Sequence, residues 1–125
     1  EPDLRCNIVG LISLRAQQTA AREPFAADAS YEQAVAFLAE AAGGSSDVMV
    51  QTEALDALVD ALAPDGTDAF PGMAAVLAGI DAAAADFGAK IKRERARLAQ
   101  DAYMHAKEVY LNLRRFVKYK RARLA

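Results

Sequence analysis

The chain of 125 residues carries a net charge of −2, is 54% hydrophobic and 26% charged, and has the size of one compact domain. Its 30 alanines favour an all-α fold, because alanine is the strongest helix former. Single cysteine and histidine residues, Cys6 and His105, exclude disulfide frameworks, Cys/His zinc sites, paired Glu-x-x-His di-iron sites and catalytic groups that need a second histidine. No stretch of 18 apolar residues occurs, which predicts no transmembrane segment.

Residues 4–19 are predicted to form a first amphipathic helix, with Asp3 as its N-cap. Its expected buried face consists of apolar residues at helical spacing, widened by two more: Leu4, Ile8, Leu11 and Ile12, with Val9 and Leu14. The helix should stop before Pro24, because proline disfavours the α conformation at the preceding residue.

Two further helices follow in the central part of the chain. Residues 30–33 read Ser-Tyr-Glu-Gln, a capping box that predicts a second helix starting near Tyr31. Gly43-Gly44 should end it in a left-handed conformation. The segment Ser45-Ser46-Asp47 offers an N-cap for a third helix, although residues 48–50 are also compatible with a short extended segment. The third helix carries an apolar stripe made of Leu55, Leu58, Val59 and Leu62.

Residues 64–68 have the composition of a turn, and Pro71 fits the first position of another helix. From Pro71 apolar residues recur at 4-3 spacing to the end of the chain. One unbroken helix would have about 50 residues and a length of roughly 80 Å, so a break is expected near residues 86–90, at Gly88. We therefore predict an up-down four-helix bundle with a long basic C-terminal helix as a fifth helix or kinked extension. No internal repeat is visible.

Charge is distributed unevenly along the chain. Residues 1–89 hold three arginines and 14 acidic residues, a net charge of −11. Residues 90–125 hold 12 basic and three acidic residues, a net charge of +9. We interpret residues 1–88 as an acidic helical bundle and residues 89–125 as a basic helix of the same domain. Such asymmetry indicates contact with a charged surface.

Two interpretations of the basic helix remain open. It either lies against the acidic bundle, as an internal arrangement, or docks on an acidic surface of a larger assembly. We favour docking, since a helix cannot bury so many charges without a severe desolvation cost. The predicted docking residues are Lys90, Lys92, Arg93, Arg95, Arg97, Arg114, Arg115, Lys118, Lys120, Arg121 and Arg123.

The alternative function is binding of nucleic acid or of an anionic membrane surface, with Tyr103, Tyr110, Phe116 and Tyr119 beside the basic residues. The charge of −11 on residues 1–89 argues against nucleic acid, and no recognition motif is present. Peripheral association with a membrane stays open. We expect no enzyme, no cofactor and no metal site, because one histidine and scattered carboxylates supply no catalytic set. His105 is expected to be partly buried and bonded to Asp101 or to backbone.

The chain begins Glu1-Pro2 without methionine, as a processed or truncated chain would. Together with the alanine-rich helical body of residues 4–87 and the basic end of residues 114–123, this start resembles the small extrinsic lumenal subunits of photosystem II. The resemblance implies a helical bundle in the thylakoid lumen that binds intrinsic photosystem II subunits electrostatically and supports oxygen evolution. It rests on architecture and composition, and no functional residue is transferred by it.

Overall fold

The computed structural model describes residues 2–44 and 47–125, and within these ranges every regular element is a helix. The predicted all-α class is therefore confirmed. The helices are α1 (Pro2–Ala20), α2 (Ala29–Ala41), α3 (Val48–Leu62), the 3-10 helix η1 (Asp65–Ala69), α4 (Met73–Glu94), the 3-10 helix η2 (Arg95–Arg97) and α5 (Gln100–Leu124).

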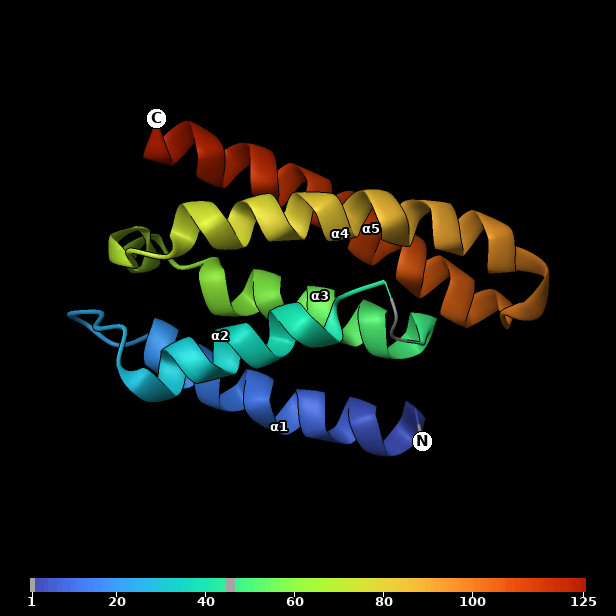
Figure 1. Ribbon diagram of the computed structural model, residues 1–125, viewed down its shortest axis with the longest axis horizontal. Coiled ribbons are helices and arrows are strands. Elements are labelled where there is room, and N and C mark those ends of the chain that lie inside the picture. Colours follow the sequence, from blue (N-terminus) through green and yellow to red (C-terminus); the bar gives the residue numbers. More distant parts are fainter. Residues whose placement is uncertain (1, 45–46) are drawn as a thin grey trace.

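Successive α-helices run in alternate directions, and α3 lies between α1 on one side and α4 on the other (Figure 1). The most extensive helix contacts join α1 to α3 and α4 to α5, and α5 also packs on α3. The predicted up-down four-helix bundle is not confirmed, because α1 and α4 occupy opposite sides of α3. The arrangement is a stack of helix layers with α3 at its centre.

The core is built around α3 and Tyr31. Both Leu55 and Leu58 are fully buried, as is expected for a helix that is covered on most of its surface. The Tyr31 ring makes edge-to-face contacts with Phe25 and Phe70, at centroid distances of 5.2 and 5.5 Å. Its hydroxyl donates a 2.8 Å hydrogen bond to the Ala61 carbonyl, and burial raises the pKa of Tyr31 to about 12. Tyr31 thereby joins α2 to the end of α3.

Aspartates cap both central helices. The Asp28 carboxylate accepts a 2.8 Å hydrogen bond from the Tyr31 amide, so α2 begins at Ala29 and the predicted Ser30 cap is wrong. Within the predicted capping segment, Asp47 caps α3 and accepts a 2.9 Å hydrogen bond from the Met49 amide, while Ser45 and Ser46 lie outside the described residues. Residues 48–50 are helical, and the alternative of an extended segment is excluded.

The glycines after α2 do not end the helix as predicted. No described glycine has a positive φ, and the C-cap Ala42 is right-handed, so the left-handed ending is wrong. A Cβ at Gly44 would lie 2.8 Å from an Asp86 carboxylate oxygen of α4. A larger residue at Gly44 would only require the carboxylate of the exposed Asp86 side chain to shift.

Helix α1 buries only part of the predicted face: Val9 is buried and Ile12 packs partly buried against the core, but the leucines of that face are not buried. Leu4, Leu11 and Leu14 are exposed to 59%, 71% and 56%, and the buried face consists of Val9, Ser13, Ala16, Thr19 and Ala20. Small side chains on that face let α1 and α3 approach closely, so packing distance has outweighed side-chain hydrophobicity in setting the orientation of α1.

The predicted break near Gly88 is also wrong. Helix α4 starts after its N-cap Gly72, with Pro71 outside the helix, and continues through Gly88 to Glu94. The chain turns only at η2, after which α5 returns along α4 (Figure 1). Gly88 makes room for α5, because a Cβ there would lie 2.8 Å from a ring carbon of Tyr110. The glycine marks close packing between helices rather than a kink.

Candidate functional site

The residues predicted to dock separate into three environments. One group is bound to acidic side chains near the C-terminus, one lysine is buried beside the loop after α2, and the remaining residues are exposed along α4, η2 and α5.

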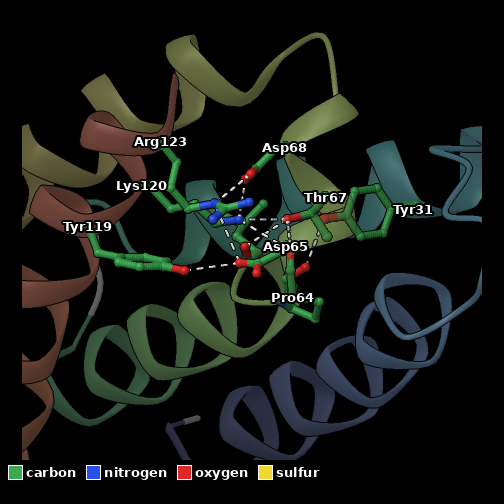
Figure 2. Close-up of polar contacts among 10 residues, drawn as sticks. Tyr31, Pro64, Asp65, Thr67, Asp68, Tyr119, Lys120 and Arg123 are labelled. Carbon is green, nitrogen blue, oxygen red and sulfur yellow. Dashed lines mark hydrogen bonds and ion pairs between the residues drawn. The ribbon is translucent and has the colours of Figure 1, made fainter. Parts of the chain in front are cut away.

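Lys120 belongs to the first group and is fully buried. Its ammonium donates hydrogen bonds to an Asp68 carboxylate oxygen at 2.6 Å, to the Thr67 hydroxyl at 3.1 Å and to the Pro64 carbonyl at 3.2 Å (Figure 2). Three acceptors, one of them a carboxylate, offset the cost of burying the charge. Lys120 is therefore a structural residue and drops out of the predicted docking set.

Two arginines extend this arrangement. Arg123 Nε lies 2.7 Å from the other Asp68 carboxylate oxygen and 3.5 Å from Asp65, while Arg121 pairs with Asp81 of α4 at 3.1 Å. The hydrogen bonds from Lys120 and then Arg123 hold the pKa of Asp68 below its usual range. We call Lys120 and Arg123 with Thr67, Asp65 and Asp68 the C-terminal clamp (Figure 2). At this end of α5 the basic residues pair with acidic residues of the same chain, as the first of the two interpretations predicts.

Lys90 is the second case. Its side chain is buried on α4, and Nζ donates a 2.8 Å hydrogen bond to the Gly44 carbonyl. Nearby, Gln51 Nε2 donates to the Ala42 carbonyl at 2.9 Å. These bonds hold the backbone of Ala42 and Gly44 against α3 and α4, so Lys90 also leaves the docking set.

The other cations are exposed, and no ion pair to a described residue is found for any of them. Arg95 stacks on the Tyr103 ring at 4.7 Å, and Arg115 donates a 2.6 Å hydrogen bond to Asn112. Lys107, which is not among the residues predicted to dock, belongs here as well. We call this set the open basic surface; it consists of Lys92, Arg93, Arg95, Arg97, Lys107, Arg114, Arg115 and Lys118.

A groove of about 560 Å³ runs between α4 and α5 within this surface. Its walls combine aromatic and aliphatic side chains with three cations, Lys92, Lys107 and Arg114, and none of its lining residues is acidic. The remaining lining residues are Ala85, Gly88, Ala89, Ile91, Tyr103, Tyr110 and Leu111. We call it the α4–α5 groove. A groove with apolar walls and a basic rim can accept an apolar side chain and its neighbouring carboxylates.

The sequence held a signal for this groove that the docking prediction did not use. Tyr103 and Tyr110 are seven residues apart, as are Lys107 and Arg114, so all four lie on one face of α5. Gly88 was read as a break, although its contact with Tyr110 makes it part of the groove.

Other candidate chemistry is not assembled by the described residues. His105 is exposed and its Nε2 lies 3.5 Å from Glu53 of α3, so the predicted bond to Asp101 or backbone is wrong. In residues 2–44 and 47–125 no group of three or more histidine, cysteine, aspartate or glutamate side chains is placed to hold a metal ion. Among the described helices, none is both long and apolar enough to cross a membrane.

Layered, antiparallel helices are the arrangement that helical-repeat proteins use. A family model described as SYO1-like, TPR repeats matches residues 1–124, and the chain belongs to this family. Neither a curated protein nor a solved structure matches the chain.

The family match corrects the resemblance to extrinsic photosystem II subunits, which is wrong. The thylakoid-lumen localisation and the photosystem II partners were implied by that resemblance and are left without support. Membership of a repeat family also shows that the lack of a visible internal repeat was a poor guide to architecture.

Proposed function

We propose that this protein is a non-enzymatic helical interaction module that binds an acidic protein partner through its open basic surface. Stacked helical repeats present extended surfaces for protein partners, so membership of the family supports a role in protein–protein interaction. The observation that carries this proposal is the contrast between cations that are already paired and those of the open basic surface, for which no ion pair to a described residue is found.

Electrostatics favour a protein partner over nucleic acid. Residues 1–89 carry a net charge of −11, which repels a polyanion that extends beyond the basic surface. An acidic segment of limited length can instead contact α4 and α5 alone. Such a contact should associate quickly and weaken as salt rises.

Binding of defined polyanions tests this function. Labelled poly-glutamate, a single-stranded RNA of equal charge and vesicles with anionic lipid are compared by anisotropy or co-sedimentation at low and high salt. We expect poly-glutamate to bind in a salt-dependent manner and RNA and vesicles to bind more weakly.

A variant in which Lys92, Arg93, Lys107, Arg114 and Lys118 are replaced by glutamine should lose poly-glutamate binding and keep its helicity. Replacing Arg5 and Arg15, two exposed arginines of α1, is the control and should change binding by less than about twofold. Tighter binding to RNA or vesicles than to poly-glutamate would overturn the proposal, as would equal poly-glutamate binding by the wild type and the variant with glutamine at five positions.

A further inference from the structure

We infer that the α4–α5 groove is a receptor for an amphipathic helix with acidic flanks, supplied by a partner protein. This inference rests on the proposed function and specifies the partner's chemistry. It concerns only the groove, whereas the proposed function concerns the whole open basic surface.

The spacing of the lining residues suits a helix. Along α5 the apolar positions Tyr103, Tyr110 and Leu111 alternate with Lys107 and Arg114 on one face. This face extends over about 16 Å from residue 103 to residue 114, or about three helical turns. A partner helix laid along it would present apolar residues at i, i+3 or i+4, and i+7, with carboxylates on both sides.

The floor of the groove is apolar and incompletely covered. Leu111 is 48% exposed, and Tyr103 and Tyr110 are half-buried beside Ile91. Gly88 and Ala89 line the opposite wall, on α4, and the Tyr110 ring lies close to Gly88, so this ring forms part of the floor. Removing this apolar surface from water supplies the affinity that a purely ionic contact at an exposed site lacks.

Cations lie on both sides of this floor. Lys92 comes from α4, and Lys107 and Arg114 come from α5, so a bound helix would meet positive charge along both edges. At the η2 end, Arg95 stacks on Tyr103 and adds a further cation. This charge complementarity specifies carboxylates on the partner and selects against basic or neutral amphipathic helices.

The experiment uses the full chain and a labelled peptide of about 18 residues, with leucines along one helical face and glutamates on either side. A scrambled peptide of the same composition has the same charge without the apolar face. Anisotropy titrations at physiological salt give the Kd. We expect the amphipathic peptide to bind at least about tenfold more tightly than the scrambled peptide.

Two double variants with equal changes in charge locate the site. Lys107→Glu/Arg114→Glu alters the groove, and Arg93→Glu/Arg97→Glu alters the open basic surface outside it. The first should raise the Kd of the amphipathic peptide at least about tenfold, and the second by no more than about threefold, since distant charges mainly affect the encounter. All four residues are exposed, and circular dichroism checks that both variants keep the wild-type helicity.

The possible results separate the two proposals. Equal weakening by both double variants, or equal affinity for the scrambled peptide, would overturn the groove and leave the proposed function standing. No binding of either peptide or of poly-glutamate would overturn both. If the wild type sediments as an oligomer that Lys107→Glu/Arg114→Glu converts to a monomer, the groove holds a second copy of this chain and the inference of a separate partner is wrong.

Discussion

The C-terminal clamp and the α4–α5 groove use the same kinds of residue on the same helix with opposite outcomes. In the clamp, Lys120 is fully buried and meets a carboxylate at 2.6 Å. In the groove, Lys107 and Arg114 are exposed and have no described carboxylate within ion-pair distance. The clamp is about two turns from the groove along α5.

The difference between clamp and groove comes from the element that packs against α5 at each position along the helix. Near the C-terminus α5 packs against η1, whose short helical turn places Asp65, Thr67 and Asp68 beside it. Further toward η2, α5 faces a stretch of α4 that contains Gly88 and Ala89 and offers no carboxylate to the groove. A basic residue of α5 stabilises the fold where the facing element supplies a carboxylate, and it faces solvent where that element does not. Positive charge in the sequence alone therefore does not define a docking site.

The largest expected effect comes from breaking the clamp. Lys120→Met removes the ammonium that binds Asp68, Thr67 and the Pro64 carbonyl. Because Asp68 keeps Arg123 and is partly exposed, we expect the free energy of unfolding to fall by about 2 to 4 kcal/mol, somewhat below the usual cost of breaking a buried pair. Urea unfolding measures this change.

Lys118→Met is the matched control, since Lys118 is an exposed lysine two positions earlier on α5. It should change the free energy of unfolding by less than about 0.5 kcal/mol. Comparable losses in the two variants would contradict a structural role specific to Lys120.

Sequence patterns predicted the helical content well and the environment of individual residues less well. A cap within residues 45–47 and the apolar stripe of the third helix depend on local chemistry and could be predicted from the sequence. The buried side of α1 was not, because close packing by Ala16 and Ala20 competes with an equally regular stripe of leucines. From its sequence neighbours alone, Gly88 indicates a weak point in a helix. Its role in packing depends on Tyr110, which lies opposite it on α5 and is distant in the sequence.

A second prediction concerns the pH dependence of the clamp. The folded-state pKa of Asp68 is lowered, so its carboxylate stabilises the fold above its unfolded pKa of about 3.9, and this contribution is lost as the pH falls through the folded-state value. Asp68→Asn should therefore lower the free energy of unfolding by about 1 to 2 kcal/mol near neutral pH.

The difference in stability between wild type and Asp68→Asn should shrink below about pH 4, as measured by urea unfolding across the pH range. Asp65→Asn, at an exposed carboxylate of the same 3-10 helix, should show a smaller difference. If the difference in the free energy of unfolding between wild type and Asp68→Asn stays constant from neutral to acid pH, ionisation of Asp68 does not stabilise the clamp.

The smallest effect is expected from a glycine of the groove. Gly88→Ala would place a Cβ 2.8 Å from the Tyr110 ring, which must move within the groove. Affinity for the amphipathic peptide should fall about three- to tenfold, or roughly 1 kcal/mol. Helix propensity acts in the opposite direction and favours alanine by up to about 1 kcal/mol.

Gly79→Ala separates these two effects, because Gly79 is on the same helix and its Cβ would meet no atom within 4 Å. It should stabilise the fold, measured by urea unfolding, without changing the Kd of the peptide. Equal peptide affinity of the two alanine variants would show that Tyr110 is not part of the binding surface.

The most direct test of the contrast between clamp and groove is NMR mapping of the wild type with the acidic amphipathic peptide. We predict that amide shift changes concentrate in residues 85–92 and 103–114, with little change in residues 62–70 and 118–124. Changes concentrated in η1 and the last turns of α5, or in α1 to α3, would contradict the assignment of binding to the groove.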